Sequence, residues 1–172
     1  MKRRTLLTAL AGGGLTAGGA WVATNGLGGG GLPVTVETLD APGSETGTVR
    51  VPVRGAVTVV DLFATWCGPC EKQMEVLSAI HGDYGEGVRF VSVTNERFGE
   101  TLTREYVRSW WADHDGAWTL GHDPDDDVMS ALGASGLPFL AVTARDGTVS
   151  WRHAGVATES DLRGAIDASL DG

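Results

Sequence analysis

The sequence predicts one α/β domain in which helices pack against a mixed β-sheet. Three observations support this prediction. Short valine-rich runs alternate along the chain with segments whose apolar residues recur at helical spacing. The tight turn Arg145-Asp146-Gly147 joins two late strands and makes them antiparallel. The capping pattern Thr158-x-x-Asp161 precedes a last amphipathic segment, so the domain closes with a helix.

The strands are recognised by their β-branched and aromatic residues and by the turn residues that separate them. One of them, 57–63, is apolar along most of its length. The expected strands, in chain order, are 34–39, 57–63, 88–94, 118–121, 139–143 and 148–152.

Helices are expected between these strands. Met74, Leu77 and Ile80 form one apolar stripe, which places a helix directly after the central strand. The expected helices are 68–81, 103–113, 125–132 and the segment after Thr158. The stretch 95–136 therefore carries additional helix and strand before the strand that begins at residue 139.

The first 24 residues are typical of an export signal. Basic residues at positions 2–4 precede a mildly apolar stretch, 6–22, and the paired arginines followed by x-Leu-Leu indicate the twin-arginine route. Because 6–22 is near the length that crosses a bilayer, a cleaved leader and a membrane tether both stay open. Residues 25–33 are a glycine-rich linker, and the folded domain is expected at 34–172.

Acidic residues dominate the part of the chain after the leader. The first thirty residues hold three of the 13 cationic residues and none of the 22 acidic ones, so the remainder has a net charge of −12. This charge argues against nucleic acid as a partner. Lys72 is the single lysine after the leader, where all other cations are arginines. Such a composition resembles that of proteins from extreme halophiles.

The motif Trp66-Cys67-Gly68-Pro69-Cys70 contains the only two cysteines of the chain. A Cys-x-x-Cys pair at a helix start is typical of a dithiol that cycles between reduced and oxidised forms. The helix N-terminus favours a thiolate on the leading sulfur, so Cys67 is the expected nucleophile. Cys70 lies one turn deeper and is the expected resolving thiol, which attacks the mixed disulfide formed at Cys67.

Three other interpretations of the two cysteines compete with this one: a zinc site, a structural disulfide, and an inactive domain that keeps its cysteines by chance. A zinc site needs two more ligands, and the four histidines of the chain show no paired spacing. A purely structural disulfide suits an exported protein, but a bridge that closes so short a loop constrains the unfolded chain little.

The run Val59-Val-Asp-Leu-Phe-Ala-Thr-Trp-Cys-Gly-Pro-Cys70 resembles the active-site segment of the thioredoxin superfamily. Thr65-Trp66 is similar to the residues that precede the motif in its extracytoplasmic, membrane-associated thiol-disulfide oxidoreductases. Gly136-Leu137-Pro138, followed by the strand 139–143, resembles the cis-proline of that superfamily and the strand it begins. The resemblance implies a thioredoxin-like fold with an insertion before the cis-proline strand.

The resemblance also implies a substrate-binding surface beside the dithiol. Leu137 is expected to pair with an extended segment of the client in a strand-like fashion. The residues carried over to this surface are Trp66, Gly68, Pro69, Leu137 and Pro138.

Asp61 interrupts the apolar strand six residues before Cys67. An aspartate in such a run either faces solvent or is buried at considerable cost, and the sequence leaves both open. The resemblance implies a buried acid that accepts the proton of the resolving cysteine, with a pKa raised by desolvation. The lysine that accompanies this acid in thioredoxins has no clear counterpart in the corresponding strand, which contains Arg89 and Phe90.

Together these features predict an exported protein-disulfide oxidoreductase that reduces or exchanges disulfides in extracytoplasmic client proteins. We expect a monomer whose only redox group is the Cys67–Cys70 disulfide, with no cofactor or metal and with an upstream membrane or soluble electron donor. One alternative is a peroxiredoxin-like peroxide reductase, although the pattern P-x-x-x-T-x-x-C is missing around Cys67. The other is a non-catalytic binding domain with a structural disulfide.

Overall fold

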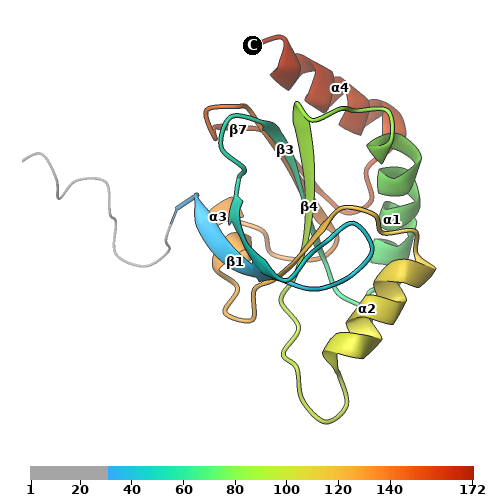
Figure 1. Ribbon diagram of the computed structural model, residues 1–172. Coiled ribbons are helices and arrows are strands. Elements are labelled where there is room, and N and C mark those ends of the chain that lie inside the picture. Colours follow the sequence, from blue (N-terminus) through green and yellow to red (C-terminus); the bar gives the residue numbers. More distant parts are fainter. Residues whose placement is uncertain (1–30) are drawn as a thin grey trace, which may run out of the picture.

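A computed structural model describes residues 31–172, which fold around one seven-stranded sheet (Figure 1). The strands are β1 (Val34–Thr38), β2 (Gly47–Val51), β3 (Val57–Phe63), β4 (Val88–Thr94), β5 (Thr119–His122), β6 (Phe139–Thr143) and β7 (Val149–Ala154). The helices are α1 (Gly68–His81), α2 (Arg104–Asp113), α3 (Asp127–Leu132) and α4 (Glu159–Leu170). The predicted leader and most of the predicted linker lie outside the described residues. Within 31–172, no helix is long and apolar enough to span a bilayer.

The sheet is mixed, as the sequence predicts, with the order β2-β1-β5-β4-β3-β6-β7. The central strand β3 runs parallel to β4 and antiparallel to β6. The predicted hairpin joins β6 and β7, and Gly147 adopts the positive φ of 92° that its turn requires. The Thr148 amide donates to Oδ1 of Asp146 at 2.8 Å, which closes this turn.

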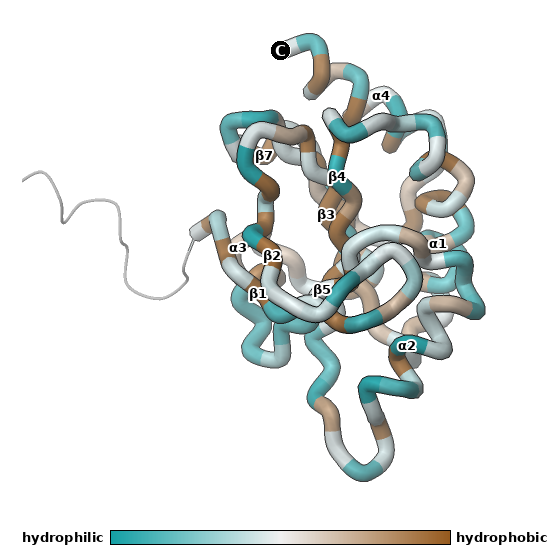
Figure 2. Tube along the Cα trace, viewed as in Figure 1, coloured by the Kyte–Doolittle hydropathy of each residue, from teal (hydrophilic) through white to brown (hydrophobic). Residues whose placement is uncertain are grey.

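The two faces of the sheet are covered by different helices. All seven residues of β3 are buried, and its apolar side chains divide between two clusters, with Val57, Val59 and Phe63 in one and Val60 and Leu62 in the other. Helices α1, α2 and α4 cover one face, while α3 lies on the other (Figure 1). Figure 2 shows the hydrophobic colour concentrated on the central strands β3 and β4. The predicted stripe of Met74, Leu77 and Ile80 is buried in the cluster beneath α1.

The sequence prediction misses one strand and misplaces several boundaries. β2 is an edge strand that pairs antiparallel with β1, and only Val51 at its end is buried. One buried residue gives no detectable alternation, so the apolar pattern could not reveal this strand. Helix α3 begins at Asp127, two residues later than predicted, because Asp126 before it takes a left-handed conformation with φ 62°.

Candidate active site

The cysteines lie where β3 ends and α1 begins, and they form a disulfide. Cys67 is the N-cap residue of α1, and its Cα lies 5.3 Å from that of Cys70. Cys67 is 5% exposed and Cys70 is 1% exposed, whereas Gly68 and Pro69 between them are exposed. The helix start that carries the bridge therefore opens to solvent on the side of Cys67.

This position gives the two sulfurs different surroundings. The first turn of a helix has amide groups without helical partners, and these stabilise negative charge on Cys67 once the disulfide is reduced. Both cysteines belong to the apolar cluster that also contains Met74 and Phe63, and Cys70 is the more deeply buried of the two. Burial there disfavours a free thiolate, so Cys70 needs a proton acceptor to react.

The predicted proline lies at the same end of the sheet. The Leu137–Pro138 bond is cis, and the carbonyl of Pro138 accepts a 2.9 Å hydrogen bond from the Gly155 amide. Phe139, the next residue, pairs in register with Leu62 of β3. Because β3 runs from Leu62 directly toward the motif, Leu137 and Pro138 lie at the end of the sheet that carries the dithiol.

Asp61 is buried, so the solvent-facing alternative is wrong. Its side chain is 2% exposed, and Oδ2 accepts a hydrogen bond from Oγ of Ser92 at 2.7 Å. Oδ1 is buried as well and has no hydrogen-bond partner among residues 31–172. Desolvation raises the pKa of Asp61 to about 7, although the Ser92 hydrogen bond acts in the opposite direction. Ser92 pairs in register with Asp61 on the adjacent strand β4.

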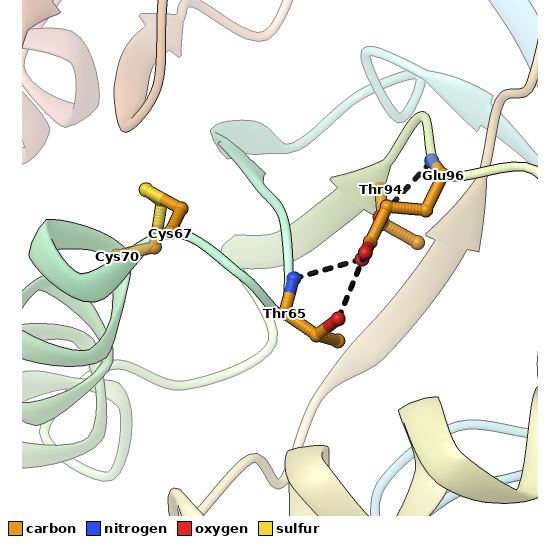
Figure 3. The surroundings of a disulfide bond; sticks show 5 residues. All are labelled: Thr65, Cys67, Cys70, Thr94 and Glu96. Atoms are coloured by element: carbon orange, nitrogen blue, oxygen red, sulfur yellow. Dashed lines mark hydrogen bonds between the residues drawn. A yellow bond between two sulfur atoms is a disulfide. The ribbon is translucent and has the colours of Figure 1, made fainter. Parts of the chain in front are cut away.

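Glu96, which the sequence analysis overlooks, holds the segment before the cysteines (Figure 3). Its carboxyl oxygens accept hydrogen bonds from the amide of Thr65 at 2.8 Å, the hydroxyl of Thr65 at 2.8 Å and the hydroxyl of Thr94 at 3.0 Å. The side chain is buried. Glu96 thus fixes the residue that lies two positions before Cys67. Its place just after the end of a buried strand, next to the end of β3, is a signal that could have identified it.

Replacing Glu96 with alanine removes three acceptor contacts and leaves the buried Thr65 amide unpaired. We expect this variant to lose about 2–4 kcal/mol of unfolding free energy, measured by urea denaturation. The reduced variant is also expected to react more slowly with a small aromatic disulfide, because the segment before Cys67 is no longer held. Glu100→Ala, an exposed change in the same loop, is the control. Equal behaviour of the two variants would show that Glu96 does not position the motif.

Exposed apolar side chains gather around the dithiol. Among residues 31–172 the large hydrophobic side chains that stay exposed are those of Trp66 at 74%, Tyr106 at 53% and Val156 at 39%. Trp66 and Tyr106 line one open hollow of about 450 Å³. Val156 lies between two residues that are anchored near the site. The Gly155 amide is hydrogen-bonded to the carbonyl of Pro138, and the Ala157 amide donates to Oε1 of Gln73 in α1 at 2.8 Å. Apolar groups therefore flank the disulfide on two sides.

Within 31–172, no group of three or more His, Cys, Asp or Glu side chains lies close enough together to hold a metal ion. The cysteines are joined to each other instead.

Known thiol-disulfide oxidoreductases are similar to this chain in sequence. The chain is 23% identical over 124 residues to the thiol:disulfide interchange protein CycY of Rhizobium leguminosarum bv. viciae, covering 69% of this chain and 61% of that protein. It is 23% identical over 115 residues to the thiol-disulfide oxidoreductase ResA of Bacillus cereus, covering 66% of this chain and 64% of ResA. The chain thus spans somewhat less than two thirds of the length of these relatives.

Solved structures confirm the thioredoxin-like fold. DsbF of Mycobacterium tuberculosis superposes with a TM-score of 0.67 at 19% identity, over 80% of this chain and 96% of DsbF. A DsbE-type interchange protein of Chlorobium tepidum gives a TM-score of 0.63 at 25% identity, over 80% of this chain and 96% of that protein. Residues 30–166 match the Redoxin family. The chain therefore belongs to the Redoxin family.

Proposed function

We propose that this protein is an exported thiol-disulfide oxidoreductase that reduces or exchanges disulfides in extracytoplasmic proteins. Cys67 attacks a client disulfide and forms a mixed disulfide with one client cysteine. Cys70 then attacks Cys67, which releases the reduced client and leaves the Cys67–Cys70 disulfide.

The observation that carries this proposal is the disulfide at the start of α1. The bridge joins two cysteines only three positions apart in the sequence. Cys67 is the N-cap residue of the helix, and Cys70 is buried. A bridge that constrains so little of the chain contributes little to stability, so a redox role explains it better than a structural one. The names of the relatives CycY and ResA support the same activity.

The surface around the bridge suits a protein client. Trp66 and Tyr106 offer exposed aromatic area beside Cys67, which suits an apolar segment next to a client cysteine. Leu137, before Pro138, offers backbone groups to an extended client segment, and Gly68 and Pro69 keep the approach to Cys67 free of bulky side chains. Asp61 accepts the proton of Cys70 in the second step.

The N-terminal sequence supports a location outside the cytoplasm, and the redox cycle implies a further partner. Residues 2–22 support export by the twin-arginine route, after which the chain is secreted or stays tethered to the outer face of the cytoplasmic membrane. The oxidised protein needs an upstream electron donor to return to the dithiol, and no cofactor takes part beyond the disulfide.

Trapping a client tests this function. A Cys70→Ser variant, expressed in its host, is expected to accumulate mixed disulfides with exported proteins, visible as adducts that disappear on reduction. These adducts form because Cys67 still attacks while the resolving step is blocked. Cys67→Ser is the matched control and should yield none. Absence of adducts from the Cys70→Ser variant would reject the proposed function.

Two further measurements separate the alternatives. A peroxide reductase would turn over hydrogen peroxide, and we expect no such turnover. A structural bridge resists reduction, with a potential below about −300 mV, whereas a catalytic couple lies above that range.

A further inference from the structure

A chain of hydrogen bonds leads from the core to the buried acid. The indole Nε1 of Trp118 donates to Oγ of Ser92 at 2.9 Å, and Ser92 lies 2.7 Å from Oδ2 of Asp61. All three side chains are buried. Asp61 lies on β3 and Ser92 on the neighbouring strand β4, while Trp118 directly precedes β5.

The chemistry of these groups fixes the direction of each bond. An indole nitrogen only donates, so Ser92 accepts from Trp118 and keeps its own proton to give away. Among residues 31–172, the Ser92 hydroxyl has no acceptor other than Asp61. Oδ2 of Asp61 therefore accepts a hydrogen bond from Ser92, and the proton that Asp61 itself gains or loses belongs on Oδ1.

We propose that Trp118 and Ser92 are positioning residues that hold Oδ2 of Asp61 and reserve its unpartnered Oδ1 as the atom that takes the proton of Cys70. This inference rests on the proposed function. It gives Asp61 a neutral, fixed hydrogen-bond donor on β4, where the sequence shows no lysine partner.

In the second step of the exchange, one proton moves to Asp61 and one disulfide replaces another. The thiol of Cys70 gives its proton to Oδ1 of Asp61, and the thiolate attacks the sulfur of Cys67 in the mixed disulfide. The bond between Cys67 and the client breaks as the Cys67–Cys70 bond forms, and the client sulfur leaves as a thiolate. Two electrons pass from the dithiol to the client disulfide.

We call the hydrogen-bonded side chains of Trp118, Ser92 and Asp61 the relay. Few other ionisable groups face it. From α1, the ring of His81 contacts those of Phe90 and Trp118, each at 5.1 Å between centroids, and burial lowers the pKa of His81. The cysteines are joined in the disulfide. Elsewhere on this face the buried or half-buried titratable side chains have other partners. Glu96 bonds Thr65 and Thr94, His122 bonds the carbonyl of Glu96, Tyr84 packs near Phe90 and bonds Asp167, His114 stacks on Trp110, and Arg163 pairs with Asp83. Glu159, Asp161, Asp167 and Asp171 of α4 and its C-terminus are exposed. His81 is thus the titration to be distinguished from that of Asp61.

The test follows the side-chain carboxyl carbon of Asp61 by NMR against pH, in the oxidised full chain, where the cysteines do not titrate. Asp61→Asn identifies the resonance, and the ring signals of His81 are recorded in parallel. Loss of the donor in Ser92→Ala is expected to raise the midpoint by about one to two pH units, since a hydrogen bond to the ionised form favours it. Ser92→Thr, which keeps the hydroxyl, should restore the wild-type midpoint.

Two tryptophan variants test whether the indole hydrogen bond of Trp118 affects the pKa of Asp61. Trp118→Phe keeps an aromatic ring but loses the indole donor, and we expect a smaller rise in the same direction. Trp111→Phe is the matched control, because it loses a comparable buried indole hydrogen bond, to the carbonyl of Pro42 at 3.0 Å, and removes no hydrogen bond to Ser92 or Asp61. The Trp111 ring packs edge-on against that of Trp118 at 5.0 Å between centroids, and phenylalanine keeps an aromatic ring there. An unchanged midpoint in Ser92→Ala or in Trp118→Phe, or an equal rise in Trp111→Phe, would overturn the proposal. Because no client takes part, these results are independent of whether the Cys70→Ser variant traps adducts.

Discussion

Between pH 4 and pH 8, the wild-type protein is expected to lose about 4 kcal/mol of unfolding free energy that an Asp61→Asn variant keeps. The unfolded chain releases the Asp61 proton near the ordinary pKa of 3.8, whereas the folded protein holds that proton until about pH 7. Within this window the folded state binds more protons than the unfolded state, so stability falls as the pH rises. Above the window both states are ionised, and the loss stays constant.

The measurement is a series of urea denaturation curves of the oxidised protein from pH 4 to pH 8. The informative quantity is the difference between the wild type and Asp61→Asn at each pH, because the other acidic groups then cancel. Asp171→Asn changes an exposed aspartate at the C-terminus and is the control, for which the difference should stay near zero at every pH. A pH-independent difference for Asp61→Asn would mean that Asp61 ionises at its ordinary pKa in the folded protein.

Gly43→Ala is expected to cost about 3–5 kcal/mol of unfolding free energy, a large part of the stability of a domain of this size. Gly43 has a positive φ of 74°, which costs a residue with a Cβ about 1–2 kcal/mol. A Cβ at this position would also overlap the backbone of Ala117 and Trp118, which cannot rotate away as a side chain can. The loop around Gly43 packs here because the Leu120 amide of β5 donates to Oγ of Ser44 at 3.0 Å.

Gly55→Ala is the matched control for this substitution. Gly55 has a similar φ of 78°, but no atom lies within 4 Å of a Cβ added there. It should therefore lose only the backbone contribution of about 1–2 kcal/mol. Thermal and urea unfolding of both variants give the comparison. Equal losses would show that the loop moves away from Ala117 without cost.

The parts of the fold that could be predicted are those with a strong local pattern. The bounds of β3, α1, β4 and β6 agree with the prediction, because each has a strong local pattern: a largely apolar run in β3 and β6, an alternating β-rich run in β4 and an apolar stripe in α1. β2 could not be predicted, since an edge strand buries almost nothing and its position depends on pairing with β1.

The residues of the candidate site also differ in how well the sequence predicts them. Cys67, Cys70 and Pro138 stand in short motifs that can be read from neighbouring residues. Glu96 and Ser92 each make their decisive contact with a residue 31 positions away, which no local pattern encodes. The resemblance to halophile proteins and the twin-arginine leader stay predictions.

The contact between Glu96 and Thr65 bears on protein engineering. Grafting Trp66 to Cys70 onto another helix start would transfer the sulfurs without Glu96, whose carboxyl group holds the segment before the cysteines. The smallest transferable unit of this site therefore includes the ends of two neighbouring strands, with Glu96 brought along beside the five-residue motif.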